Sequence, residues 1–377
     1  MRVHKLNDDS GAVAVVVALL SVVLVGVGAF TVDFGQAYVA KRNVSTAADA
    51  ASLAGAKELA KLSGTCASIL LNTAKISAAQ TVADGYRTDN VSSSTRNAWD
   101  VTCDTSSSNL GVLVHYGAQT TSPRALGGLF GVSGDYGVAR EATASVSVAD
   151  IASGLRPYAL CFSDLPSLQS SPNVVQLNFP AAGCPVSPPV ASGDWYSIRC
   201  PEDQNNGTGG LAGSTQNGCS TDISIVTVPP SATTPAAISS ALQAACPSAS
   251  AEPGCLQANP GNLSSGQIPN AWDTLIDKDI LLPVFYPNSL AGSGSNTIFP
   301  VYSFAAVHVC GYHFGNNKTA VSTDAGCQGK TFTGSGNFSA LLLKLTQVIS
   351  SGSTHTSTCT LGDTACDFGA RTVHLVK

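Results

Sequence analysis

The sequence predicts an α+β protein: a long N-terminal transmembrane helix continues as an Ala-rich amphipathic helix, and a mainly β, disulfide-containing exported region follows. Residues 11–32 form one uncharged apolar stretch, and all twelve cysteines of the 377-residue chain lie after it. An even number of cysteines without any C-x-x-C spacing is typical of structural disulfides in an oxidising compartment. Free buried thiols are the alternative.

The apolar stretch 11–32 contains 22 residues. As a helix it spans roughly 33 Å, enough to cross the hydrocarbon core of a bilayer. A secretory signal peptide is the alternative, but its apolar core usually has about 7 to 15 residues and precedes an A-x-A-like cleavage site. We therefore expect a single-pass anchor with residues 1–10 as a cytoplasmic tail. Because every cysteine follows the span, the C-terminal side is expected to be extracytoplasmic.

Residues 33–64 continue the helical pattern without proline and predict an amphipathic helix. Small residues recur on one face at spacings of three and four, which lets another backbone approach closely. This candidate packing face consists of Val44, Ala47, Ala48, Ala51, Ala54 and Gly55. It either lies on the chain's own domain or binds a partner helix. In the second case Ala51→Leu would disrupt assembly while leaving insertion and folding intact.

Residues 65–152 are predicted to form a small α+β unit. It begins with a helix at 66–86, followed by strands at 98–103, 110–116 and 138–149. Cys66 and Cys103 are the only cysteines before Cys161, so their pairing would tie the helix to the first strand.

Residues 153–377 are predicted to form a Cys-rich, mainly β exported domain. A strand-like segment at 157–161 precedes a loop-rich stretch at 170–266, and the strongest strands are 280–286 and 297–312. Residues 338–349 fit helix or strand, and 371–376 form a last strand. Cys246 with Cys255, Cys310 with Cys327, and Cys359 with Cys366 are candidate disulfides; the other pairings stay open.

Several motifs in the first sixty residues occur together in one known family. They are Val32-Asp33-Phe34-Gly35, the segment Tyr38 to Asn43 with its Lys-Arg pair, and the Ala-rich run from Thr46 to Ala56. Over residues 11–59 the sequence resembles the TadE/TadG-like family of Flp (tight adherence) pilus-assembly membrane proteins. Pilin-like members of that family have Glu at the fifth position after the cleavage-site Gly, where this chain has Val16. The resemblance therefore implies a pilus-associated protein and not a pilin.

Chemistry-bearing motifs are sparse. His308, Cys310, His313 and Cys327 form the most metal-like group, but strand alternation places His313 on the opposite face from His308. A Cys310–Cys327 disulfide with incidental histidines is favoured over a metal centre. The chain has neither G-x-S-x-G nor H-E-x-x-H. We therefore predict no enzyme activity and no catalytic, cofactor-binding or metal-binding residues.

The functional expectation follows from the anchor and the resemblance. A net charge of −5 without a basic run argues against nucleic-acid binding. The expected partners are the lipid bilayer and other Tad/Flp pilus-assembly proteins, contacted through the N-terminal helix, with a homo-oligomer left open. The expected function is non-catalytic assembly of a Flp/Tad-type pilus or related secretion apparatus. Alternatives are an exported adhesion or binding module and a membrane-tethered hydrolase.

Overall fold

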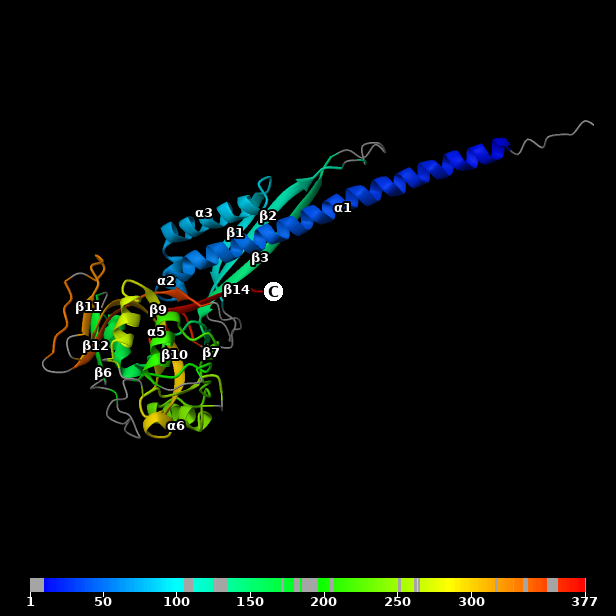
Figure 1. Cartoon of the computed structure of the whole chain (residues 1–377). Helices are drawn as coiled ribbons and strands as arrows, with labels where there is room; N and C mark the ends of the chain where they lie inside the picture. Colours follow the sequence, from blue (N-terminus) through cyan, green and yellow to red (C-terminus); the bar gives the residue numbers. More distant parts are fainter. Residues whose placement is uncertain are drawn as a thin grey trace, which may run out of the picture.

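The computed structural model is a mixed α+β fold in which one long helix projects from a body containing two main sheets (Figure 1). The α+β prediction is confirmed. The structure describes these residues: 10–104, 111–124, 126, 134–170, 173–179, 184, 196–203, 207–249, 252–260, 263, 265–315, 318–327, 329–334, 338–350 and 359–376.

Helix α1 (Ser10–Ala60) is continuous across the predicted boundary between the apolar and amphipathic segments. Its 51 residues correspond to about 77 Å. The predicted single helix at 66–86 is wrong, because α2 (Cys66–Leu70) and α3 (Thr73–Asn90) are separate. The Asn72 side chain accepts a hydrogen bond from the Lys75 N–H at 3.2 Å and so caps the start of α3.

The first sheet has the strand order β1-β2-β3-β14-β13, and α1 and α3 lie against it (Figure 1). Its strands are β1 (Thr95–Cys103), β2 (Val112–Ser122), β3 (Tyr136–Val148), β13 (Val348–Ile349) and β14 (Ala370–Val376). The predicted strands 98–103, 110–116 and 138–149 correspond to β1, β2 and β3, although residue 110 lies outside the described residues. Buried Val112, Val114, Val146 and Leu59 form the core between helix and sheet.

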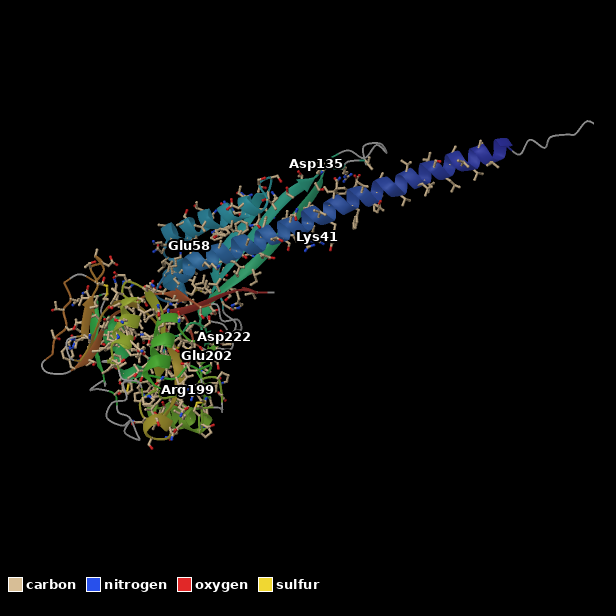
Figure 2. The ribbon with its side chains drawn as sticks, in the orientation of Figure 1. Lys41, Glu58, Asp135, Arg199, Glu202 and Asp222 are labelled. Carbon is tan, nitrogen blue, oxygen red and sulfur yellow. A yellow bond between two sulfur atoms is a disulfide. The ribbon has the colours of Figure 1, made fainter. Side chains whose placement is uncertain are left out.

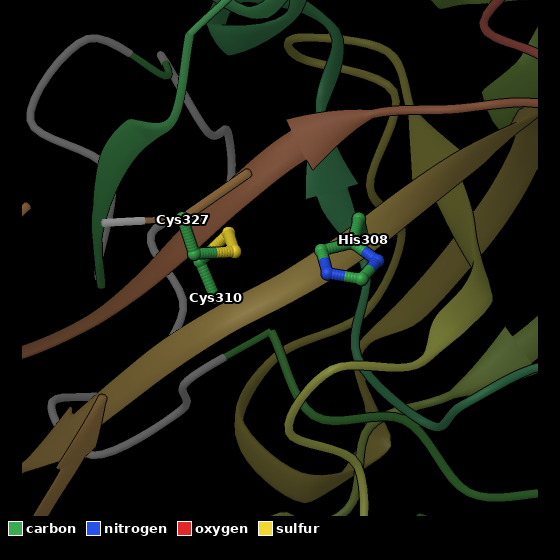
Figure 3. Close-up of side chains that lie close together, drawn as sticks. All are labelled: His308, Cys310 and Cys327. Carbon is green, nitrogen blue, oxygen red and sulfur yellow. A yellow bond between two sulfur atoms is a disulfide. The ribbon is translucent and has the colours of Figure 1, made fainter. Parts of the chain in front are cut away.

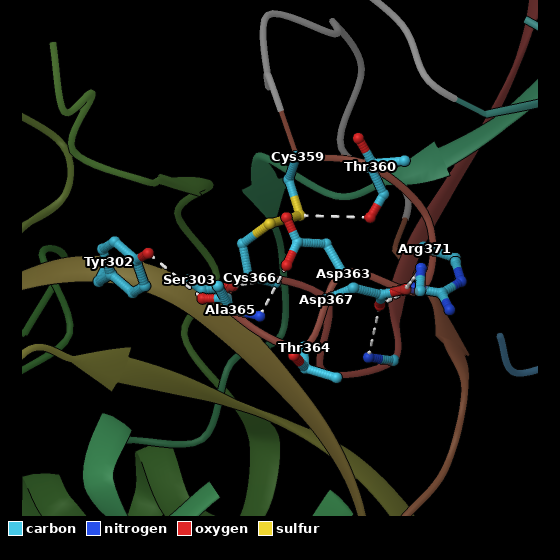
Figure 4. The surroundings of a disulfide bond; sticks show 12 residues. Tyr302, Ser303, Cys359, Thr360, Asp363, Thr364, Ala365, Cys366, Asp367 and Arg371 are labelled. Carbon is cyan, nitrogen blue, oxygen red and sulfur yellow. Dashed lines mark hydrogen bonds and ion pairs between the residues drawn. A yellow bond between two sulfur atoms is a disulfide. The ribbon is translucent and has the colours of Figure 1, made fainter. Parts of the chain in front are cut away.

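Strand β14 comes from the predicted second domain but completes the sheet of the first. It pairs antiparallel with β3, with Arg371 opposite Val148. The predicted boundary between residues 152 and 153 is therefore not a boundary between separate sheets, because strand pairing joins the two regions. The division into two domains stays a prediction. At this junction the buried Asp367 carboxylate accepts a hydrogen bond from the Gly362 N–H at 2.6 Å and forms an ion pair with buried Arg371 (Figure 4).

The second sheet has the order β5-β9-β10-β12-β6, with β8 and β11 also paired to β10. Its strands are β5 (Leu160–Cys161), β6 (Val175–Phe179), β8 (Cys255–Gln257), β9 (Asp279–Phe285), β10 (Ile298–Phe314), β11 (Lys318–Val321) and β12 (Ser339–Leu345). The ambiguous segment 338–349 is therefore strand. Aromatic rings of Trp272, Phe285, Phe299 and Phe314 fill the core beside β10.

The segment predicted to be loop-rich, 170–266, also contains helices that the sequence analysis missed. The described α-helices after residue 153 are short: α4 (Leu165–Ser170), α5 (Thr208–Asn217), α6 (Pro235–Ala245) and α7 (Gln267–Asp273). Two 3₁₀ turns, Phe162–Asp164 and Gly294–Asn296, and the small pair β4 (Ile151–Ala152) with β7 (Ile223–Ser224) complete the described elements.

Candidate functional site: the exposed apolar helix

The first part of α1 is apolar and faces solvent. Val13, Leu24 and Phe30 are 60%, 70% and 65% exposed, and only 6% of the most apolar 18-residue window is buried. A core helix of a soluble protein would hide such side chains. This helix is long and apolar enough to cross a membrane.

The exposed part of the helix meets the body at the far end of the β2–β3 hairpin. The Leu126 N–H donates to Asp33 Oδ1 at 3.0 Å, and Asp33 is buried. Figure 2 shows Lys41 and Asp135 at this end of the hairpin and Glu58 near the opposite end. The first carboxylate after the apolar stretch is therefore held by the folded body.

Aromatic and cationic side chains surround the helix just beyond residue 32. A cavity of about 300 Å³ between α1 and β3 is lined by Phe34, Tyr38, Lys41, Tyr136 and Arg140, among others. The Arg124 guanidinium lies 4.1 Å from the centre of the Tyr136 ring. Amphipathic rings and Lys or Arg side chains are enriched where membrane proteins meet the headgroup layer. This composition fits the level at which a span of residues 11–32 leaves the bilayer.

The small-residue face lies on the chain's own domain. Val44, Ala47, Ala48 and Ala51 have no exposed surface, and Ala54 is 5% exposed. Their buried neighbours come from α3 and β2: Ala83, Tyr116 and Ala118.

Gly55 approaches β1 so closely that an added Cβ would lie 3.0 Å from Trp99 Cη2. In the structure this face packs against the chain's own domain, as in the first of the two alternatives.

A hydrogen-bonded group fixes α3 over the same sheet. Tyr116 donates from its hydroxyl to Asp84 Oδ1 at 2.6 Å and accepts from Arg87 Nε at 3.1 Å. Burial, and then the hydrogen bond to the Asp84 carboxylate, raise the pKa of Tyr116 above its usual value. The phenol therefore stays protonated and keeps donating, which holds α3 and β2 together beside α1.

Replacing Ala51 with Leu is expected to destabilise the folded body by about 1–3 kcal/mol, because the site is fully packed. If the face instead bound a partner helix, folding would stay intact. Urea unfolding monitored by tryptophan fluorescence, with disulfides intact, measures the change. Ala50→Leu, at the neighbouring and partly exposed position, is the matched control. Equal stability of the two variants would contradict the packing argument.

All twelve cysteines are paired, in six disulfides. The structure places bonds at each of the four candidate pairs and adds two that the sequence left open. The two additional bonds join Cys161 to Cys184 and Cys200 to Cys219. The longest of the six closes a separation of 37 residues, so each disulfide stabilises a local loop or joins neighbouring elements.

The predicted His308, Cys310, His313 and Cys327 group separates into different environments. Figure 3 shows the sulfurs of Cys310 and Cys327 bonded to each other beside His308. The bond leaves no thiolate for a metal. His313 instead stacks on Phe338, with ring centres 4.2 Å apart.

The lining of one cavity shows which catalytic groups it could supply. This cavity, of about 550 Å³, is lined by Ser93, Thr95, Gln119 to Thr121 and residues 137–139. Its described lining contains hydroxyl, amide and small apolar groups, and no acid or histidine. The cavity therefore provides no general acid or base of the usual kinds.

Comparison with known proteins finds one family model that matches part of the chain. Residues 11–58 match the model of the family described as "Putative Flp pilus-assembly TadE/G-like". The match covers the exposed apolar part of α1 and the part that packs on the first sheet. No curated protein and no solved structure matches the chain.

Proposed function

We propose that this chain is a membrane-anchored, extracytoplasmic and non-catalytic assembly protein of a Flp/Tad-type pilus or a related secretion apparatus. The observation that carries the proposal is α1 itself. Its segment matching the TadE/G-like family joins an exposed apolar span to a small-residue face buried on the body. The span anchors, and the buried face fixes the direction in which the body projects from the membrane.

The orientation of the chain across the membrane follows from the position of the disulfides relative to this helix. Every disulfide lies after the span, and disulfides form on the oxidising side of a membrane. The body is therefore extracytoplasmic and residues 1–10 cytoplasmic. Because the 44–55 face is covered, the exposed part of α1 remains for contact with other pilus-assembly proteins. Its small residues Ala14 and Ala18 permit close approach of a helix within the bilayer.

An exported adhesion or binding module is the second candidate. The observation that favours it is that residues 59–377, most of the chain, lie outside the family match. In that case the α1 anchor would be shared with the family, and the loop-rich second region would carry the function.

The test is deletion of the gene in a host that makes Flp-type pili, followed by complementation. Full-length chain should restore pili seen by electron microscopy, and a chain lacking residues 11–32 should not. Fractionation, external protease digestion and non-reducing gels establish anchoring and side independently. Normal piliation in the deletion strain, with the chain still anchored outside, would reject pilus assembly and favour the adhesion module.

A further inference from the structure

Three side chains from separate segments converge beside the middle of β10. Asp277 follows α7, His308 lies on β10, and Asp324 lies in the loop after β11. One carboxylate oxygen from each aspartate and one ring nitrogen of His308 all lie within 4.8 Å of one another. The two aspartates are exposed, whereas His308 is 19% exposed, so the cluster is open to solvent on one side.

The orientation of His308 is fixed by a fourth residue. Its Nδ1 lies 2.7 Å from Asp279 Oδ1, and Asp279 is its partner in the β9–β10 register. An ionised carboxylate can only accept a hydrogen bond, so Nδ1 carries a proton, and in the tautomer with that single proton the lone pair lies on Nε2. This is the arrangement in which metal-binding histidines are commonly held.

The other nitrogen of His308 has no hydrogen-bond partner among the described residues. This atom, Nε2, is buried and lies 3.9 Å from Asp324 Oδ2. A lone pair directed towards carboxylate oxygens is unfavourable unless a cation lies between them. Either a second proton on the ring or a bound metal ion would satisfy this geometry.

The Asp277 carboxylate and the Asp324 backbone are held by contacts that do not depend on an ion. Ser322 donates from its hydroxyl to Asp277 Oδ1, and the same hydroxyl accepts from the Asp324 N–H at 2.9 Å. The Asp277 N–H donates to the Val309 carbonyl at 3.0 Å, and Asp277 has a left-handed backbone with φ of 62°. Ser322 therefore links the Asp277 carboxylate to the Asp324 backbone beside the same strand.

The Cys310–Cys327 disulfide provides the second attachment. It ties the loop that carries Asp324 to β10 two residues beyond His308, and the Ser322 N–H donates to the Cys310 carbonyl at 2.8 Å. The bond that removes the thiols as ligands thus brings a carboxylate to the imidazole. Three ionised aspartates carry a greater formal charge than the two lysines near them. Lys278 is adjacent to Asp277 and Asp279 in sequence, and Lys344 lies opposite His308 on β12.

We propose that Asp277, His308 and Asp324 form a binding site for a divalent transition-metal ion such as Zn²⁺, with Asp279 as a positioning residue. One imidazole and two carboxylates suit Zn²⁺ and leave a position for water, whereas Ca²⁺ and Mg²⁺ prefer oxygen ligands alone. Bonds of roughly 2.0–2.2 Å require the carboxylates to move inward, which their exposure allows. The ion would join the turn at 277, β10 and the loop at 322–327.

The test is calorimetric titration of the full-length chain in detergent, with a histidine-free purification tag and prior chelation. Zn²⁺ is expected to bind one ion per chain with a dissociation constant on the order of 1 μM or tighter. Ca²⁺ and Mg²⁺ should bind far more weakly. Co²⁺ as a substitute should give visible absorption bands that are displaced by Zn²⁺.

Variants locate the ion. His308→Ala and Asp324→Asn should each weaken Zn²⁺ binding by more than the roughly 10- to 100-fold expected for Asp279→Asn, which alters only the positioning contact. His313→Ala, on the same strand but stacked on Phe338, is the matched control and should bind as the unaltered chain does. Asp324 is half-exposed, so its isosteric variant should fold normally even if His308→Ala does not. Absence of one-to-one binding, or equal binding by Asp324→Asn, would overturn the site and leave the pilus proposal untouched.

Discussion

Replacing Val22 and Val23 together with arginine is expected to lower membrane retention of the protein strongly. Residues 11–32 contain thirteen Val, Leu and Phe side chains. At about 0.3–0.6 kcal/mol each, these favour insertion by roughly 4–8 kcal/mol. Two central arginines cost about 2.5–3.5 kcal/mol apiece, and loss of the two valines adds about 1 kcal/mol, so the sum is close to zero.

Alkaline extraction of membranes followed by immunoblotting measures retention. Val22→Leu with Val23→Leu preserves the apolar character and serves as the control. A chain that fails to insert also stays on the reducing side, so the double arginine variant should lose the mobility difference between reducing and non-reducing gels. Full retention of that variant would show that residues 11–32 are not the anchor.

The second large effect is expected at the junction of the two sheets, where Asp367→Ala should destabilise the body by about 3–5 kcal/mol. Asp367 and Arg371 have side chains only 3% and 2% exposed and form an ion pair. Removing the carboxylate leaves a buried guanidinium without its counter-charge. The Gly362 and Gly369 N–H groups lose their acceptor as well.

Equilibrium unfolding in urea, with disulfides intact, measures this change. Asp363→Ala is the matched control because Asp363 is an exposed carboxylate in the Cys359–Cys366 turn that directly precedes Asp367, and it should cost under about 1 kcal/mol (Figure 4). Similar losses for the two variants would mean that burial of the ion pair contributes little. Protection of β14 amides from hydrogen exchange should fall together with stability in Asp367→Ala.

Local patterns in the sequence were sufficient for the elements with strong periodicity. The apolar stretch predicted the exposed helix, and β9 and β10 were located within two residues at each end. Helix α6 was missed although its signals are present: Thr234 caps it, and Pro235 occupies its first turn. The Pro- and Ser-rich composition around the helix led to the prediction of a loop there. The break at Asn72 was missed because the apolar pattern continues through it.

Other features have no local signal. The buried face of α1 was identified from its small residues, but periodicity cannot say whether a sheet of the same chain or another helix covers it. Pairing of β14 with β3 depends on tertiary structure alone. Likewise, Asp277, His308 and Asp324 come from three segments with no shared motif, and they meet only because β10 and a disulfide bring them together.

The position of β14 in the first sheet has a consequence for biogenesis. If the body is exported as proposed, translocation from its N-terminal end delivers β1, β2 and β3 before residues 370–376 have crossed the membrane. Until then β3 presents an uncovered edge beside the anchor, where another copy emerging nearby could pair with it. Arrival of β14 covers that edge. Completion of translocation, and not emergence of the N-terminal unit, is thus the step after which neighbouring chains no longer compete for the same strand.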